Sequence, residues 1–352
     1  MVQATLIGTA ATMPLPDRAL AAAAIGAQGR LILLDCGEGT QTAARRAHVS
    51  LLRIDLIAMT HYHGDHIFGL PGLMQTLGSL GRTERLTITG PEGLDAAMAP
   101  VLALAGELPY EVQCVSLPPE GLPLRTLHPA WPPEARLLPV PTRHRVVSQG
   151  YRFILGRPGK FQAERARQLG LPQSLWRTLQ HGQSVAWAGR TIDPSEVLGP
   201  ARRGVTVVYS GDTMPCDALA QAAEDADLLI CEATYAQEEQ AEQAATYGHM
   251  TFAQAGALAA RAGVRQLWLT HYSAMIADPQ EEAFRAQEHF PGAVCGVDGM
   301  AEELSFQGYT AMSSARFSLR FWSGSGRIRR LYKGRILRYN GADSKEQGGN
   351  GL

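Results

Sequence analysis

The sequence predicts an α/β fold, in which helices pack in layers against β-sheets. Apolar runs of strand length, each bounded by turn residues, recur along the chain, and segments with the helical period lie between them. We find no short sequence repeat, which excludes a solenoid.

The expected elements alternate along most of the chain. Strands are expected at residues 3–8, 30–34, 56–60, 86–89, 111–116, 136–141, 150–155, 205–210, 227–231 and 266–270. Helices are expected at residues 65–78, 91–105, 161–169, 216–224, 251–262 and 279–289.

The composition is that of an ordinary globular protein. Of the 352 residues, 45% are hydrophobic and 18% are charged, so the chain can bury a sizeable core. The net charge of −1 does not by itself indicate a nucleic-acid-binding protein. Any such function must therefore depend on a local patch.

The cysteines and the N-terminal sequence indicate in which cellular compartment the protein is expected. The five cysteines are scattered without a CxxC pair, which argues against both a disulfide framework and a thiolate zinc site. The N-terminal MVQATLIGTA lacks the features of a signal peptide, and no run approaches the roughly 18 apolar residues that span a bilayer. We therefore expect a soluble, cytoplasmic protein with no membrane contact.

The run HYHGDH at residues 61–66 carries the strongest chemical signal. It follows a predicted strand and places three imidazoles and one carboxylate within six residues. His61 and His63 lie two apart on extended backbone, so both can face one cation, while Asp65 and His66 can face a second. Imidazole nitrogens and carboxylate oxygens are ligands that catalytic zinc prefers.

Further candidate ligands stand where later predicted strands end. His144, Asp212 and His271 each come directly after an apolar strand. A metal site built along a sheet edge requires this placement, and catalytic groups commonly lie in such connections. Asp35 also follows a strand, and we expect it to orient a ligand histidine rather than to bind metal itself.

Two segments are locally basic. Residues 152–203 contain nine Lys or Arg against three acids, with several Gly and Pro residues, so part of the segment could project as an arm or form a solvated insertion. The tail at 311–352 is also basic, with eight Lys or Arg between residues 316 and 338. We expect the tail to be a largely disordered extension of a catalytic domain at 1–310.

These motifs resemble the metallo-β-lactamase superfamily, and within it the ribonuclease Z family of tRNA 3′-processing endonucleases in their short form. The resemblance is carried by LGTAATMPLPDR, LLDCGEGTQ, HYHGDHIFGLPGL, YSGDT, CEATY, GHMT and LTHYSA, which together span about residues 5–300. It implies a four-layer αβ/βα sandwich. It also implies zinc-dependent removal of the 3′ trailer from precursor tRNA, leaving a 3′-hydroxyl.

The resemblance implies two Zn²⁺ ions per subunit, although this ligand set also accepts Mn²⁺. One ion would be held by His61, His63 and His144, the other by Asp65, His66 and His271, with Asp212 between them. Asp65 would also hold the proton of the attacking water. By resemblance, His249 donates a proton to the leaving oxygen, and Glu232 is a candidate to orient His249.

The resemblance also implies that the insertion at about 157–203 is a tRNA-binding arm and that the protein is a homodimer, with arm and active site on different subunits. Candidate RNA contacts are Arg157 and Lys160 at the arm root, Arg177 near its tip, and Arg18 in the N-terminal loop. The tip reads PQSLWRTLQHGQS, which departs from the Gly/Pro/Lys-rich pattern of the family.

Two other functions are compatible with the residues. A hydrolase of small esters or phosphodiesters would share HxHxDH but would lack the basic insertion. A non-catalytic RNA-binding module with a relic metal site would be expected to have lost ligands, whereas all seven ligand positions are filled here.

Overall fold

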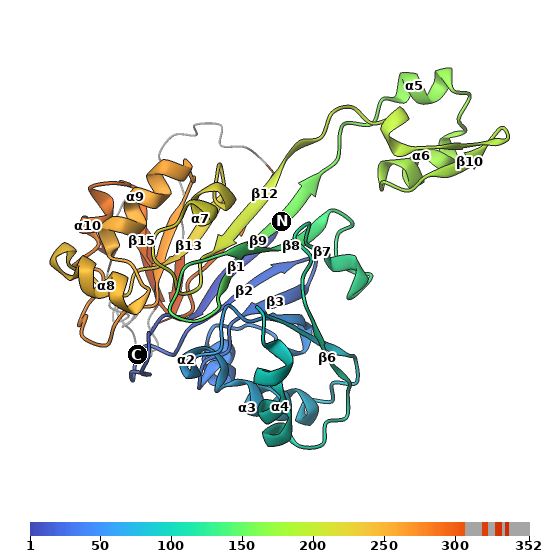
Figure 1. Ribbon diagram of the computed structural model, residues 1–352. Helices are drawn as coiled ribbons and strands as arrows, with labels where there is room; N and C mark the ends of the chain where they lie inside the picture. Colours follow the sequence, from blue (N-terminus) through green and yellow to red (C-terminus); the bar gives the residue numbers. More distant parts are fainter. Residues whose placement is uncertain (307–318, 323–327, 333–334, 338–352) are drawn as a thin grey trace, which may run out of the picture.

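The computed structural model describes residues 1–306, 319–322, 328–332 and 335–337. It confirms the predicted four-layer sandwich: two β-sheets face each other, and helices cover the outer face of each (Figure 1). No helix of the described residues is long and apolar enough to cross a bilayer.

The first sheet is built around the N-terminal half of the chain. Its strands lie in the order β19 (Arg335–Leu337), β18 (Ile328–Tyr332), β17 (Leu319–Trp322), β16 (Ala301–Leu304), β1 (Val2–Gly8), β2 (Ala22–Ala27), β3 (Arg30–Leu34), β4 (Ile54–Ala58), β5 (Leu86–Thr89) and β6 (Val112–Val115). Strands β3 to β6 are parallel, whereas β1, β2 and β3 alternate in direction.

The second sheet comes from the C-terminal half. Its order is β15 (Ala293–Cys295), β14 (Leu267–Thr270), β13 (Leu228–Glu232), β12 (Arg202–Tyr209), β9 (Gln149–Arg157), β8 (Ala135–Pro141) and β7 (Leu122–Pro123). Strands β12 to β15 are parallel. Because β9 is antiparallel to both its neighbours, β8 runs in the same direction as β12. The ends of β8, β12, β13 and β14 therefore share one edge of the sheet.

Three apolar cores hold the layers together. The central core lies between the sheets and includes Trp131, Tyr151, Phe153 and Trp268, which are almost completely buried. The outer cores join each sheet to its helices. The first sheet is covered by α1 (Thr40–Arg46), α3 (Leu70–Ser79) and α4 (Leu94–Ala105), the second by α7 (Asp217–Ala222), α9 (Phe252–Ala262) and α10 (Phe284–Gln287). Short elements complete the fold: α2 (Gly64–Ile67), α8 (Ala241–Tyr247), η1 (Leu51–Arg53), η2 (Leu124–Thr126), η3 (Pro194–Glu196) and η4 (Glu238–Gln240).

The helix expected at residues 65–78 is divided into α2 and α3. The break falls at Gly69, whose N–H donates to the Cys36 carbonyl at 2.9 Å. A Cβ at Gly69 would lie 2.1 Å from the Gly37 carbonyl oxygen. The backbone of the metal-site loop therefore packs directly on the segment that follows β3, and this packing interrupts the helix.

Between β9 and β12 the chain leaves the sandwich and forms a small separate unit (Figure 1). This arm contains α5 (Ala163–Gln168), α6 (Gln173–Gln180) and the hairpin of β10 (Val185–Trp187) and β11 (Arg190–Ile192). It has its own apolar core, which includes Leu171, Leu179 and Val197. At its root the two chain segments pair, with the Gly199 N–H donating to the Lys160 carbonyl at 2.9 Å.

In the tail, which the sequence predicts to be largely disordered, β17, β18 and β19 continue the first sheet. Apolar and basic residues intermingle in LRFW, IRRLY and RIL, and such half-apolar segments can add to a sheet edge. The rest of the tail, with its last dozen residues, lies outside the described residues.

Candidate metal centre

The structure brings all seven predicted ligands together at the carboxyl ends of the strands. One group contains His61, His63, His144 and Asp212, and the other contains Asp65, His66 and His271. Within each group the candidate ligand atoms lie within 4.8 Å of one another. The first sheet supplies the residues of the HYHGDH loop after β4, whereas the second sheet supplies those that follow β8, β12 and β14.

In the first group three imidazole nitrogens converge. His63 Nδ1 lies 3.0 Å from His61 Nε2 and 3.2 Å from His144 Nε2. Asp212 closes the group, with Oδ2 3.7 Å from His61 Nε2.

In the second group His66 Nε2 lies 3.2 Å from His271 Nε2. Asp65 Oδ2 lies 3.6 Å from His271 Nε2 and accepts the Thr12 N–H at 2.7 Å. Asp212 Oδ1 lies 3.4 Å from His66 Nε2 and 3.3 Å from His271 Nε2. The Asp212 carboxylate therefore faces both groups, one oxygen toward each.

Hydrogen bonds behind the imidazoles fix which nitrogen carries a proton. His66 Nδ1 donates to Asp35 Oδ2 at 2.9 Å, so Asp35 lies where it can orient this imidazole. His144 Nδ1 donates to the Gly248 carbonyl at 2.8 Å. His61 Nδ1 lies 3.1 Å from Thr60 Oγ1, whose own proton goes to Asp35. With these Nδ1 atoms protonated, the Nε2 lone pairs all point into the centre.

His271 is oriented in the same way by a residue that the sequence analysis did not single out. Thr234 Oγ1 donates to Glu232 Oε2 at 2.7 Å and faces His271 Nδ1 at 2.9 Å. Thr60 and Thr234 each lie two residues beyond the end of a strand, within two positions of a candidate site residue (His61 and Glu232). That adjacency is the signal by which they could have been found.

The electrostatics favour neutral imidazoles in the first group. Burial, together with the neighbouring imidazoles, lowers the pKa of His61, His63 and His144. These side chains are therefore uncharged near neutral pH, which is the form that binds metal.

The second group attracts positive charge instead. Burial lowers the pKa of His66, but Asp212 and Asp35 outweigh it and hold that pKa well above its ordinary value. Burial would raise the pKa of Asp212, but His271 and His66 hold it well below its ordinary value.

The donor set fits a divalent cation. Asp212 Oδ1 is buried and has no hydrogen-bond partner among the described residues, and a buried carboxylate oxygen without a partner is costly. Converging imidazole lone pairs also repel one another unless something positive lies between them. A metal ion satisfies both requirements, so the residues present fit the metal that the motifs predict.

His249 lies beside this cage and is tied to Glu232. His249 Nδ1 is 2.8 Å from Glu232 Oε1 and 3.9 Å from Asp212 Oδ2. Burial lowers the pKa of His249, but the Glu232 carboxylate outweighs burial and raises that pKa to about 9. His249 is therefore protonated near neutral pH, and Glu232 holds its Nδ1 in place.

Three of the seven non-glycine residues that have a positive φ in the described part of the chain lie at this edge. Thr12, Asp35 and His271 have φ of 61°, 57° and 60°, in the left-handed region that side chains other than glycine rarely adopt. Each touches the cage: Asp35 and Thr12 through hydrogen bonds, and His271 as a candidate ligand. Such strain is typical of functional sites.

The predicted RNA contacts lie in different places. Arg18 is buried, and its guanidinium donates to the Ile276 carbonyl at 2.7 Å, so it joins two loops. Arg157 is half-buried at the arm root, where it stacks on Phe306. Lys160 and Arg177 are exposed on the arm.

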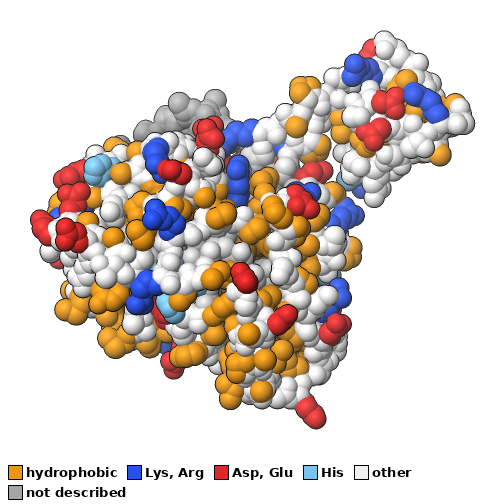
Figure 2. All heavy atoms as spheres, viewed as in Figure 1, with side chains coloured by type: hydrophobic (Ala, Val, Ile, Leu, Met, Phe, Trp, Pro, Cys, Tyr) orange, Lys and Arg blue, Asp and Glu red, His pale blue; other side chains and the backbone are white. Residues whose placement is uncertain are grey.

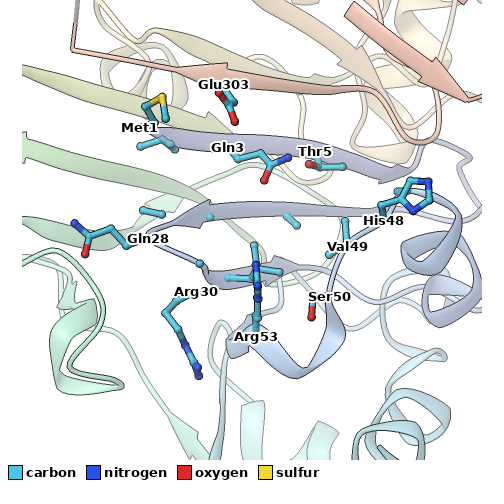
Figure 3. Close-up of a pocket in the computed structure, with 17 residues that line it drawn as sticks. Met1, Gln3, Thr5, Gln28, Arg30, His48, Val49, Ser50, Arg53 and Glu303 are labelled. Atoms are coloured by element: carbon cyan, nitrogen blue, oxygen red, sulfur yellow. The ribbon is translucent and has the colours of Figure 1, made fainter. Parts of the chain in front are cut away.

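An open cavity of about 250 Å³ lies away from this centre (Figure 3). It is lined by residues such as Gln3, Gln28, Arg53 and Glu303. These come from the start of β1, the β2–β3 turn, η1 and β16, at the strand ends opposite the cage. The cavity therefore contributes nothing to the metal centre.

Known proteins share this fold and sequence. A model of the metallo-β-lactamase superfamily matches residues 21–147, and one of the β-lactamase superfamily domain matches residues 124–272. The crystal structure of human tRNase Z, short form, aligns with a TM-score of 0.59 over 86% of this chain and 99% of that one. At 24% identity, this likeness concerns the fold alone.

The sequence relatives are more specific. Ribonuclease Z from Agathobacter rectalis is 41% identical over 308 residues, which cover 87% of this chain and 99% of that protein. Ribonuclease Z from Clostridium tetani is 38% identical over 311 residues, covering 87% and 100%. As the motifs predicted, this chain belongs to the ribonuclease Z family of the metallo-β-lactamase superfamily.

Proposed function

We propose that this endoribonuclease removes the 3′ trailer from precursor tRNA and holds two Zn²⁺ ions per subunit. One observation carries the proposal: a complete seven-residue cage stands beside a His249–Glu232 pair in a chain that matches ribonucleases Z over almost their whole length. One ion would be held by His61, His63 and His144, the other by Asp65, His66 and His271, with Asp212 between them.

The metal ions, when bound, lower the pKa of water toward about 7 and neutralise charge on the phosphate. Two side chains of the protein then accept and donate the protons of the reaction. Asp65 takes the proton of the attacking water, while the Thr12 N–H keeps its carboxylate aimed at the cage. Because the tRNA product ends in a 3′-hydroxyl, the bond that breaks joins phosphorus to the 3′ oxygen, and His249 supplies the proton to that oxygen.

The arm is proposed to grip the RNA away from the cleavage point, since it projects from the sandwich (Figure 1). Figure 2 shows cationic and acidic side chains close together on the arm. Two arginines there pair with acids, Arg167 with Glu164 and Arg190 with Glu196. Lys160 and Arg177 are exposed and, within the described part of the chain, form no ion pair, so they are the stronger candidates for phosphate contact.

We further propose a homodimer in the cytoplasm, in which the arm of one subunit serves the active site of its partner. The length and direction of the arm support this arrangement, because an arm that points away from its own metal centre can reach RNA bound elsewhere (Figure 1). Light scattering during gel filtration measures the oligomeric state. Mixing an arm-deleted subunit with an inactive Asp212→Ala subunit should restore cleavage only if arms act across the dimer.

The decisive experiment is incubation with a 3′-extended precursor tRNA and mapping of the product end. A deletion variant distinguishes an RNA-cleaving enzyme from a hydrolase of small esters. Residues 161–198 are replaced by a short Gly-Ser turn, since Lys160 and Gly199 are already paired. The deletion should abolish precursor cleavage and leave hydrolysis of a small chromogenic phosphodiester intact. Equal effects on both substrates would contradict the role of the arm.

A further inference from the structure

An exposed cation lies next to the metal centre, and no acidic residue in the described part of the chain pairs with it. Arg145 directly follows the candidate ligand His144, and its guanidinium carbon lies 5.3 Å from the ring centre of Tyr247. Arg145 is exposed, and Tyr247 keeps 43% of its surface in solvent. Unlike Arg203, which pairs with Asp227, Arg145 forms no ion pair with any residue that the structure describes.

The position of this pair relative to the reacting groups is fixed by backbone packing. The Gly248 carbonyl accepts a hydrogen bond from His144 Nδ1. A Cβ at Gly248 would lie 2.7 Å from that nitrogen and 2.9 Å from the Arg145 backbone nitrogen. Arg145 and Tyr247 therefore flank His144 and His249, whose ring centres are only 5.0 Å apart.

A second aromatic ring lies at the same place. Tyr235 is partly exposed, and its ring centre lies 6.4 Å from that of His249. Its backbone is fixed by the Phe252 N–H, which donates to the Tyr235 carbonyl at 3.0 Å. One edge of the cage thus presents a free guanidinium together with two tyrosines.

We propose that Arg145 and Tyr247 bind the RNA nucleotide next to the scissile bond, the guanidinium taking a phosphate oxygen and the tyrosine ring stacking on a base. The assignment rests on the proposed function. Guanidinium groups recognise phosphate through paired N–H donors, and exposed tyrosines stack on unpaired bases. A strand whose reacting phosphate lies in the cage has to pass over its edge, where these side chains lie.

The test compares Arg145→Ala with Arg85→Ala, an exposed arginine that precedes β5, at the strand ends opposite the metal centre. Arg145→Ala should lower kcat/KM on precursor tRNA by about tenfold more than it lowers hydrolysis of a small phosphodiester. The dependence of log kcat/KM on log salt should become shallower by about 0.7 to 1, as expected for one lost phosphate contact. Arg85→Ala should match the wild type.

Tyrosine variants test the stacking. Tyr247→Phe should retain RNA cleavage, and Tyr247→Ala should lower it by roughly 5-fold or more, since stacking on one base contributes about 1–3 kcal/mol. Metal content is measured for every variant. The proposal is overturned if Arg145→Ala leaves cleavage and its salt dependence unchanged, or if it lowers both substrates equally.

Binding separates this proposal from the proposed function. Anisotropy with a labelled single-stranded RNA oligonucleotide should show weaker binding for Arg145→Ala than for Arg85→Ala, even if the wild type failed to cut precursor tRNA. Failure to cut would overturn the proposed function alone. Equal RNA binding by Arg145→Ala and Arg85→Ala would overturn the proposed role of Arg145 in binding RNA.

Discussion

Glu232 holds His249 through a 2.8 Å contact between Oε1 and Nδ1, and its carboxylate is itself fixed by further donors. Oε1 accepts the Thr213 N–H at 2.8 Å, and Oε2 accepts the Thr234 hydroxyl at 2.7 Å. The carboxylate therefore cannot turn away, and the imidazole keeps both its proton and its direction.

The dependence of kcat/KM on pH should reflect the pairing of His249 with Glu232. The pKa of His249 is raised to about 9, so a step that needs its proton runs fully below that pH and is lost as the pH rises through about 9. Glu232→Gln should move the alkaline limb of kcat/KM down by roughly 1 to 3 pH units. His249→Ala should lower kcat by about 100-fold or more with metal still bound. If the alkaline limb of kcat/KM stays at the same pH in Glu232→Gln, Glu232 does not position His249 as proposed.

Metal removal should destabilise the protein. Chelation leaves Asp212 Oδ1 buried without a hydrogen-bond partner among the described residues, and it leaves the lone pairs of His61 Nε2 and His63 Nδ1 facing each other at 3.0 Å. A ligand present at a thousand times its Kd contributes about 4 kcal/mol of stability, so the chelated protein should melt several degrees lower and recover with added Zn²⁺. Asp212→Ala should show a much smaller difference between the two conditions. Identical melting with and without chelator would contradict the metal assignment.

Gly248 should not tolerate a side chain. Gly248→Ala would strain a φ of 77° and push a Cβ against His144 Nδ1. Gly189→Ala is the matched control, since Gly189 has a φ of 78° with nothing within 4 Å. In both variants the left-handed backbone should lower the free energy of unfolding by about 1 kcal/mol. Only Gly248→Ala should also lower the affinity for metal, by roughly 10- to 100-fold. Titration with a zinc indicator measures the difference, and equal affinities would contradict it.

Asp298 should make stability depend on pH. Its carboxylate accepts the Ala19 N–H and the Thr9 hydroxyl, and burial raises its pKa to about 6 from 3.8. The folded state thus favours the protonated acid. This contribution is present below about pH 4 and is lost as the pH rises through 6.

Asp298→Asn cannot ionise, so it removes that dependence. The unfolding free energy of the wild type relative to the variant should fall by about 2 kcal/mol between pH 4 and 7. Chemical denaturation at several pH values gives the two curves. Parallel curves would show that Asp298 does not titrate in this range.

Much of the fold could be predicted because buried strands leave a clear apolar signature. Strands β3 and β5 have the expected bounds, and the ligands His144, Asp212 and His271 follow strands as expected. Strand β2 was missed since its sequence, AAAIGA, is rich in alanine, a strong helix former, and only pairing with β1 and β3 makes it a strand.

Other parts of the site depend on long-range contacts that sequence spacing does not show. Arg18 is a candidate RNA contact from the sequence, but the structure also gives its guanidinium the Ile276 carbonyl as a partner, 258 residues further along the chain. Thr60 and Thr234 act between a ligand and a carboxylate that only the folded sheets bring together. The division of the helix at Gly69 likewise follows from packing on Cys36 and Gly37.

The candidate ligands follow strands of both sheets, so the nuclease can become active only after both sheets have formed. His61 to His66 leave the ribosome early, but His271 follows β14, near the end of the described sandwich. Until that strand has been made and has docked, the second group lacks one of its three side chains. A chain that lacks β14 therefore has an incomplete second ligand group, and under the proposed mechanism it should not cleave RNA.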